Sequence, residues 1–400
     1  MGSRFFTAEH EALRERIRGF VRAELAPHVD EWEAREQFPR EIFKRMGELG
    51  LLGLRYPEEY GGQGRDYFAA VVLSEELARC GIGGLPMAVA VHAEMATPPI
   101  FQFGTEEQKQ RYLAPAIRGE KVACLGITEP NAGSDVAAIQ TTARSDSQPI
   151  ASKDGAGWVI NGRKIFITNG IQADFITLLA RTESAGTDLA RTDKQKSYDG
   201  LSLFLVDKGT PGFEVARKVE KVGMRSSDTA ELVFEDCRVP GDALLGQQGR
   251  GFHQIMWELQ GERLIAAAGA VATAGHILEL TVKYVGERQR SGGRLVLSQT
   301  AAHTLAEMAT RIEAARQLTY ATAWKFANNL YPVKEISMAK LIAARTAFWV
   351  ADRALEIHGG DGCPKGHPIE RFWRDTRLNR IAGGTDEIML EIISRELELR

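Results

Sequence analysis

The sequence contains few cysteines and no paired spacing of metal-binding residues. The 400-residue chain has four cysteines, Cys80, Cys124, Cys237 and Cys363, and none of them belongs to a CxxC pair. Widely separated cysteines argue against a disulfide framework and indicate reduced thiols inside a cell. Residues 358–367 also hold two histidines, an aspartate and a cysteine, but zinc ligands usually come as paired short spacings. We therefore expect no metal ion.

An excess of one charge and a long apolar run are also missing. Lys and Arg total 50 against 53 Asp and Glu, so the totals suggest no basic face for nucleic acid. The N-terminus, MGSRFFTAEHEALRER, carries charges where a signal peptide needs an apolar run. The longest weakly apolar run, Leu264–Gly275, is alanine-rich and too short to span a bilayer. We expect a soluble intracellular protein, cytoplasmic if bacterial, with no targeting segment and no membrane insertion.

Hydrophobic periodicity divides the chain into three parts. Apolar residues recur at helical spacing before residue 120, whereas short runs of β-branched and aromatic residues follow as far as residue 239. We predict an α+β fold with a helical N-terminal domain (1–120), a central antiparallel β-barrel or sandwich (121–239) and a C-terminal four-helix bundle (240–400). The four long helices of the last part are expected at 250–288, 298–329, 333–358 and 384–398.

Several local signals predict where these elements begin and turn. Thr105 with Gln108 has the spacing of a capping box at a helix start. Asn161-Gly162 lies between two β-rich runs, GWVI and RKIFI, and predicts the turn of a β-hairpin. The polar segment 183–200 is expected to be an exposed loop.

Near the C-terminus, Gly383-Gly384-Thr385 interrupts an amphipathic stretch and leads into a helix. Such a turn leaves backbone N–H groups without partners, and an anion or a carbonyl oxygen could bind them. A C-capping glycine followed by an N-capping threonine would explain the same residues without any ligand. Both interpretations remain open at this point.

Two segments of the β region depart from ordinary strand composition. TEPNAGSD (128–135) follows a strand and contains the polar side chains of Thr128 and Ser134. In KIFITNG, Phe166 and Thr168 alternate along a strand and should share one face. An aromatic ring beside a hydroxyl could stack on and hydrogen-bond to a planar heteroaromatic ring. Plain packing of an aromatic against a threonine is the alternative.

A candidate base lies on the first long helix of the C-terminal part. Glu262 and Arg263 precede a run of small residues, Ala266 to Gly269, which would let a ligand approach closely. A carboxylate next to such a surface can have its pKa raised by desolvation into the range of a general base. The alternative is a solvated glutamate on an exposed helix face.

Together these segments resemble the acyl-CoA dehydrogenase family of flavoproteins over nearly the whole chain. TEPNAGSD resembles one family signature, and EIHGGDG, IERFWRD and IAGGTDEI resemble the C-terminal one. KIFITNG is similar to the strand that contacts the flavin, although Phe166 stands where most members have Trp. ERQRSG (287–292) resembles the ERxxFG segment, with Ser291 in place of Phe.

The resemblance implies that the cofactor is FAD and that the protein is a homotetramer built from dimers. Thr128 and Thr168 would hydrogen-bond the flavin ring, Phe166 would pack against it, and Ser134 would lie where the flavin phosphates and the substrate pantetheine pass. Three residues, Arg288, Gln299 and Gly360, would reach FAD across a subunit boundary, and Thr385 and Glu387 would also lie near FAD.

The resemblance also implies the chemistry of the glycine turn. Many members carry their catalytic glutamate directly before Gly-Thr, where this sequence has Gly383. Isovaleryl-type and long-chain-type members carry it in an ERL segment instead, which matches Glu262. The Gly383 N–H would then donate to the thioester carbonyl as an oxyanion-hole contact. Arg263 and Gly384 are expected to contact the substrate as well.

The activity implied is FAD-dependent α,β-dehydrogenation of an acyl-CoA to the trans-2-enoyl-CoA, as in fatty acid β-oxidation, with electrons passed to electron-transfer flavoprotein. The position of the base suggests branched or longer acyl chains, and the segment 85–101, with Met87 and Met95, is expected to line the acyl pocket. A flavin oxidase or monooxygenase on the same fold, or a non-catalytic FAD-binding assembly protein, are the alternatives.

Overall fold

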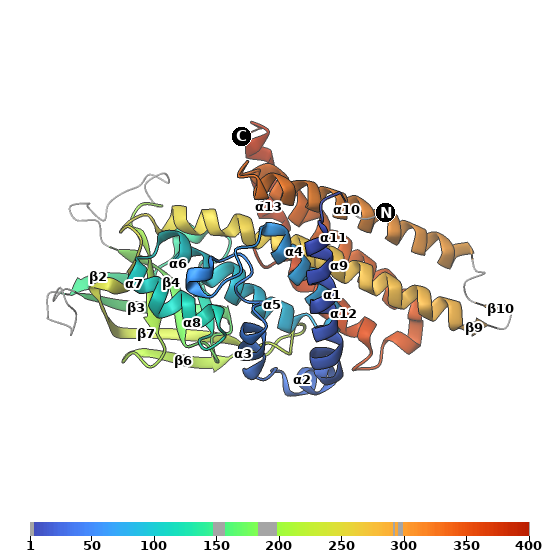
Figure 1. Cartoon of the computed structure of the whole chain (residues 1–400), viewed down its shortest axis with the longest axis horizontal. Coiled ribbons are helices and arrows are strands. Elements are labelled where there is room, and N and C mark those ends of the chain that lie inside the picture. Colours follow the sequence, from blue (N-terminus) through green and yellow to red (C-terminus); the bar gives the residue numbers. More distant parts are fainter. Residues whose placement is uncertain (1–3, 147–156, 183–197, 291–292, 295–298, 400) are drawn as a thin grey trace.

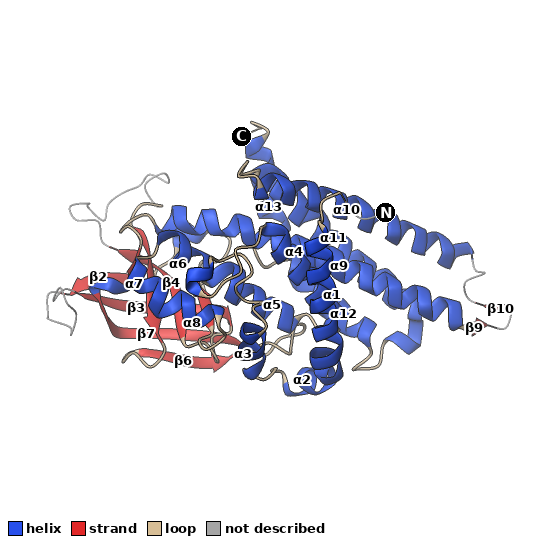
Figure 2. Ribbon diagram, in the orientation of Figure 1, coloured by secondary structure: helices blue, strands red, loops and turns tan. Residues whose placement is uncertain are grey.

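The structure is a computed structural model that describes residues 4–146, 157–182, 198–290, 293–294 and 299–399. It has a sheet at one end of the molecule and long helices at the other (Figures 1 and 2). The long helix α9 (Gly251–Glu287) runs from the sheet region into the helical region. The α+β fold class is therefore confirmed. Most of the predicted loop 183–200, and Ser291, lie outside the described residues.

The N-terminal part is helical, and capping side chains mark where its helices begin. The predicted capping box is present: the Gln108 N–H donates to Thr105 Oγ1 (3.2 Å), and the Thr105 N–H donates to Gln108 Oε1 (3.0 Å). The helices are α1 (Ala8–Phe20), α2 (Val29–Arg35), α3 (Glu41–Glu48), α4 (Tyr67–Leu77), α5 (Gly84–Ala90), α6 (Pro98–Phe103), α7 (Glu106–Gln108) and α8 (Ala114–Ile117), with a π-helical turn η5 (Val91–Ala96) between α5 and α6.

The central part is one eight-stranded sheet in the order β6-β7-β3-β2-β4-β5-β8, with β1 also paired to β4. Most pairs are antiparallel as predicted, but β1 and β2 both run parallel to β4, so the sheet is mixed. Sequence patterns do not show these pairings because they join segments that are not neighbours in the chain. The strands are β1 (Ala123–Gly126), β2 (Thr142–Asp146), β3 (Gly157–Thr168), β4 (Phe175–Thr182), β5 (Leu201–Asp207), β6 (Phe213–Lys218), β7 (Thr229–Pro240) and β8 (Leu244–Leu245).

The predicted hairpin turn at Asn161-Gly162 is wrong. Both residues lie inside β3, where Asn161 is opposite Thr142 of β2 and the pairing with β7 shifts register between Ile160 and Gly162. Gly162 is needed for a close approach instead, because a Cβ there would lie 2.6 Å from the Thr141 Cα. An Asn-Gly pair is therefore the site of a β-bulge in this protein.

Helices return in the C-terminal part with bounds close to the predicted ones. They are α9, α10 (Gln299–Ala327), α11 (Val333–His358), α12 (Pro368–Thr376) and α13 (Asp386–Glu396), and a short antiparallel pair, β9 (Gln289–Arg290) and β10 (Gly293–Arg294), follows α9. Helix α13 begins one residue after Thr385, which caps it by accepting a hydrogen bond from the Ile388 N–H (3.3 Å).

Helix α9 belongs to two hydrophobic cores. Ile255, near its start, packs with buried residues of the sheet and of α6, whereas Leu264 to Ile277 pack with α4, α10 and α11. The turn of α9 from Glu258 to Arg263 therefore lies where the two cores meet.

By length and composition alone, α9 could cross a membrane, and no other helix in the described ranges meets that test. A buried core helix meets it too, so the finding is weak evidence for a membrane span. The apolar run singled out in the sequence, Leu264–Gly275, is only the middle of this helix.

Candidate active site

Three segments that are distant in the sequence meet around Glu262. Arg263, next to it on α9, donates from Nε to the Gly383 carbonyl (3.0 Å), and Lys340 of α11 donates from Nζ to the Gly384 carbonyl. A Cβ placed on Gly383 would lie 3.0 Å from Glu262 Oε1. The structure thus brings the predicted base and the glycine turn into contact.

The turn needs glycine at both positions. Gly383 has φ 68° and Gly384 has φ 103°, which is the left-handed region that other residues rarely adopt. A side chain on Gly383 would also crowd Glu262. Among the described residues, the Gly383 N–H has no hydrogen-bond partner. The turn therefore has the free donor that the sequence predicted, in addition to the Thr385 cap.

Glu262 is buried, with 6% of its surface exposed, which rules out a solvated helix face. Burial raises the pKa of its carboxyl to about 7, while the positive charges of Arg263 and Lys340 oppose this rise. A carboxylate whose pKa lies near neutrality can take a proton and release it again at physiological pH.

Charged side chains hold the glycine turn in place. Burial lowers the pKa of Lys340 to about 8, and the nearby carboxylates of Asp386 and Glu262 oppose this effect. Asp386, the first residue of α13, accepts hydrogen bonds from Arg380 (2.7 and 2.9 Å) and Arg345 (3.1 Å). These bonds and the Arg263 and Lys340 contacts fix the turn from both sides.

A second group of predicted residues lies at the sheet. The Ile165 N–H of β3 donates to the Thr128 carbonyl (2.9 Å), which brings the TEPNAGSD loop beside KIFITNG. The loop is anchored by a buried ion pair between Glu129 and Lys164 (2.8 Å). The side chains of Thr128 and Thr168 are half-buried, and Ser134 is exposed.

Phe166 departs from the geometry that the sequence predicted. The pairing of β3 with β7 shifts register between Lys164 and Ile167, and Phe166 has φ 60°. Simple alternation therefore does not place Phe166 and Thr168 on one face, because a bulge re-aims the side chains around it. The Phe166 ring is 62% exposed, a high value for a large aromatic residue.

A third group lies at the far end of α9. Arg288 forms an ion pair with Asp361 (3.2 Å), the neighbour of Gly360, and a Cβ on Gly360 would meet open space. Along α9 this group is roughly 39 Å from Glu262, at 1.5 Å per residue. Gln299 begins α10 and is exposed. Thr385 and Glu387, by contrast, lie in and beside the glycine turn.

Sequence reasoning missed several buried or half-buried charged residues of this region. Lys340 stands among apolar neighbours of α11, and Glu258 lies one helical turn before Glu262. Arg55 and Glu94 form an ion pair (2.8 Å), and Glu94 acts electrostatically on Glu258. A charged residue at an apolar position of a helix is the signal that could have identified Lys340 and Glu258.

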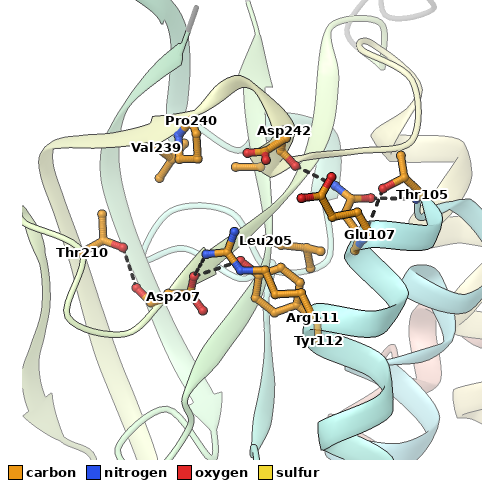
Figure 3. Close-up of a pocket in the computed structure, with 12 residues that line it drawn as sticks. Thr105, Glu107, Arg111, Tyr112, Leu205, Asp207, Thr210, Val239, Pro240 and Asp242 are labelled. Atoms are coloured by element: carbon orange, nitrogen blue, oxygen red, sulfur yellow. Dashed lines mark hydrogen bonds and ion pairs between the residues drawn. The ribbon is translucent and has the colours of Figure 1, made fainter. Parts of the chain in front are cut away.

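A small cavity of about 50 Å³ lies elsewhere, between α7 and the sheet (Figure 3). Its lining residues include Arg111 and Tyr112, which both hydrogen-bond to Asp207 (2.7 and 2.9 Å). These groups satisfy one another, and no site residue predicted from the sequence lines the cavity. It is not the candidate site. The described residues also contain no cluster of potential metal ligands.

The residues at the sheet and at the far end of α9 fit a large cofactor with a planar ring and phosphates. Phe166 presents an exposed ring, and a Cβ on Gly133, Gly359 or Gly360 would meet no atom within 4 Å. Both ring nitrogens of buried His358 lack partners among the described residues. Open backbone and unpaired polar atoms of this kind suit a dinucleotide.

Comparison with known proteins identifies the family. Models of the N-terminal, middle and C-terminal domains of acyl-CoA dehydrogenase match residues 7–120, 124–237 and 249–398. A probable acyl-CoA dehydrogenase of Bacillus subtilis, YngJ, is 38% identical over 98% of both chains. The crystal structure of an acyl-CoA dehydrogenase from Geobacillus kaustophilus is 38% identical, with a TM-score of 0.92 over 99% of this chain and 100% of that one.

The structure of PigA in complex with FAD is similar as well, with a TM-score of 0.91, 26% identity and full coverage of both chains. The three domain matches together cover most of the sequence, and the fold agrees with them throughout. The chain belongs to the acyl-CoA dehydrogenase family, and it is an oxidoreductase that uses FAD.

Proposed function

We propose that this protein catalyses α,β-dehydrogenation of an acyl-CoA thioester, with Glu262 as the base that removes the α-proton. The observation that carries this proposal is the contact between the buried carboxyl of Glu262 and the Gly383 turn. It supplies a proton acceptor and a hydrogen-bond donor at one place. When bound, FAD supplies the acceptor for the hydride that leaves the β-carbon.

The Gly383 N–H donates to the thioester carbonyl in this proposal. Its contribution grows as negative charge develops on that oxygen, because a fixed donor in a water-poor site costs no reorganisation. Arg263 and Lys340 bind the carbonyl groups of Gly383 and Gly384, which anchors the two peptide groups that follow the Gly383 N–H. The positive charge of both side chains also favours the enolate-like transition state.

Burial tunes Glu262 for this role. An ordinary carboxyl is too weak a base for an α-proton, and the raised pKa of about 7 reduces that mismatch while leaving much of the side chain ionised near neutral pH. The proton that Glu262 accepts can pass to solvent after product release.

Thr128 and Thr168 are proposed to hydrogen-bond the flavin ring, Phe166 to pack against it, and Ser134 to contact the flavin phosphates and the pantetheine. Thr385 and Glu387 are proposed to lie beside the same cofactor. Arg288, Gln299 and Gly360 are proposed to bind the FAD of a neighbouring subunit. The length of α9 supports this, because roughly 39 Å separate Arg288 from Glu262 within one chain. We propose a homotetramer in consequence.

The experiment is anaerobic reduction of the purified flavoprotein by a panel of acyl-CoA thioesters. Loss of the visible flavin absorbance, together with formation of the enoyl-CoA, is expected for at least one straight or branched acyl chain. Electron-transfer flavoprotein should then reoxidise the enzyme faster than oxygen does. Rapid oxygen consumption would indicate an oxidase instead, and no reduction by any thioester would contradict the proposed function.

A further inference from the structure

A second carboxyl group is buried one helical turn before the proposed base. Glu258 is 3% exposed, and four residues along α9 place it on the same face as Glu262. No hydrogen bond or ion pair reaches either of its carboxyl oxygens in the part of the chain that the structure describes. A buried polar group without a hydrogen-bond partner destabilises the folded protein, so we expect a bound ligand to supply the missing partner.

A second cation in this region, Arg55, already has a partner. Arg55 forms an ion pair with Glu94 of η5 (2.8 Å), and its guanidinium carbon lies 4.7 Å from the centre of the Tyr67 ring. Tyr67 in turn donates to the Gly261 carbonyl of α9 (3.0 Å). This network holds Arg55 against Glu94 and fixes both beside α9.

Arg263 is likewise committed, because its Nε donates to the Gly383 carbonyl. Burial and the negative charges of Glu262 and Glu94 raise the pKa of Glu258 well above its ordinary value, against the opposing effect of Arg263. This environment favours the neutral form of the Glu258 carboxyl over the ionised form. In that form it can donate one hydrogen bond and accept others.

We propose that Glu258, beside the Arg55–Glu94 pair, is a subsite for a hydroxyl or amide group on the acyl chain of the substrate. This proposal rests on the proposed function. A hydroxyl or a primary amide both donates and accepts hydrogen bonds, which matches a neutral carboxylic acid. A carboxylate on the chain is disfavoured, because it would add a third acidic group beside Glu258 and Glu94.

The spacing along α9 locates the polar group on the chain. Glu258 is four residues, about 6 Å, from Glu262 along the helix axis. The hydroxyl or amide should therefore lie a few carbon–carbon bonds beyond the α-carbon from which Glu262 takes the proton. The segment 85–101, expected from the sequence to line the acyl pocket, contributes Glu94 to this region.

The test compares matched thioesters in anaerobic flavin reduction: pentanoyl-CoA with ω-hydroxypentanoyl-CoA, and hexanoyl-CoA with ω-hydroxyhexanoyl-CoA. One hydroxylated compound is expected to react about tenfold faster than its alkyl partner at limiting concentration, the effect of one well-placed hydrogen bond. Glu258→Leu should reverse this preference, whereas Glu258→Gln, which keeps a donor and an acceptor, should largely preserve it. If the leucine variant does not fold, Glu258→Met replaces it.

Gln260→Leu is the matched control. Gln260 is also buried and has an unpartnered Oε1, but two residues rotate its side chain about 200° around α9. It should leave the hydroxyl-to-alkyl ratio unchanged. A wild-type preference for the alkyl compound at both lengths, or an unchanged ratio in Glu258→Leu, would overturn the subsite. If no thioester of either kind reduces the flavin, the proposed function itself fails, which is a different result.

Discussion

Replacement of Glu262 by glutamine tests the central step of the proposed reaction. Glutamine keeps the shape of the side chain and cannot accept the α-proton. Loss of a general base alone costs about 10²–10⁴-fold in rate. Substrate binding should persist, because it depends mainly on contacts with CoA and the acyl chain. The assay is single-turnover flavin reduction by stopped-flow, with binding measured separately by the change in the flavin spectrum.

The pH dependence of the rate in the same assay tests whether Glu262 is the group that accepts the α-proton. Burial raises the pKa of Glu262 to about 7, so the wild-type rate should rise with pH through about 7 and then level off, because only the ionised carboxyl is a base. The residual rate of Glu262→Gln should lack this rise. Flavin reduction by Glu262→Gln at a rate close to that of the wild type would refute the assignment of the base.

Moving the catalytic carboxylate from residue 262 to residue 383, where many family members carry it, needs more than the substitution Gly383→Glu. A Cβ on residue 383 would lie 3.0 Å from Glu262 Oε1, and the residue has φ 68°. Glutamine at position 262 would keep that crowding, so the double variant Glu262→Gln, Gly383→Glu should stay inactive. Glu262→Ala with Gly383→Glu removes the obstacle and should recover part of the rate, at a conformational cost of about 1–2 kcal/mol.

Three further predictions follow from the same geometry. Glu262→Gln should stabilise the protein above neutral pH, because a carboxyl whose pKa rises from 4.5 to about 7 on folding destabilises the folded state as pH increases between these values. At pH 8 the variant should melt at a higher temperature than the wild type, and its free energy of unfolding should be larger by up to about 3 kcal/mol. Near pH 4.5 the two proteins should melt at about the same temperature. Lys340→Met removes a positive charge beside Glu262 and should move the acid limb of the pH–rate profile to higher pH. The control Lys334→Met should leave that limb unmoved. An unmoved limb in Lys340→Met would exclude the charge effect. Arg288→Ala should weaken FAD retention on gel filtration, and a monomer that retains FAD fully would contradict the shared site.

Much of the helical architecture could be predicted because its signals are local. The spacing of apolar residues gave α9 and α11 within a residue at each end, and Thr105 with Gln108 formed the expected cap. These features depend on residues three or four positions apart, which interact in any helix. The prediction of a hairpin turn at Asn161-Gly162 failed because its outcome is not local. Whether this pair forms a turn or a β-bulge depends on the pairing of β3 with β7, about seventy residues later in the chain.

The candidate site could be predicted in part. Its motifs predicted Glu262, the glycine turn and the strand proposed to face the flavin, because each motif is contiguous in sequence. The bulge at Phe166 was not visible, since the register between β3 and β7 decides it. Glu258, Arg55 and Glu94 were missed because their importance comes only from their position together beside α9, which the fold decides.

The amino-acid sequence establishes which residue types are available: a glutamate followed by arginine on a long helix, and two glycines before a threonine. The tertiary structure alone decided that Glu262 touches the turn at Gly383, and that Lys340 supports that turn from α11. It also decided the proton affinity of the site. A carboxyl group is an ordinary acid in an unfolded chain, and it becomes a base near neutral pH only when packing removes its water and places charges around it.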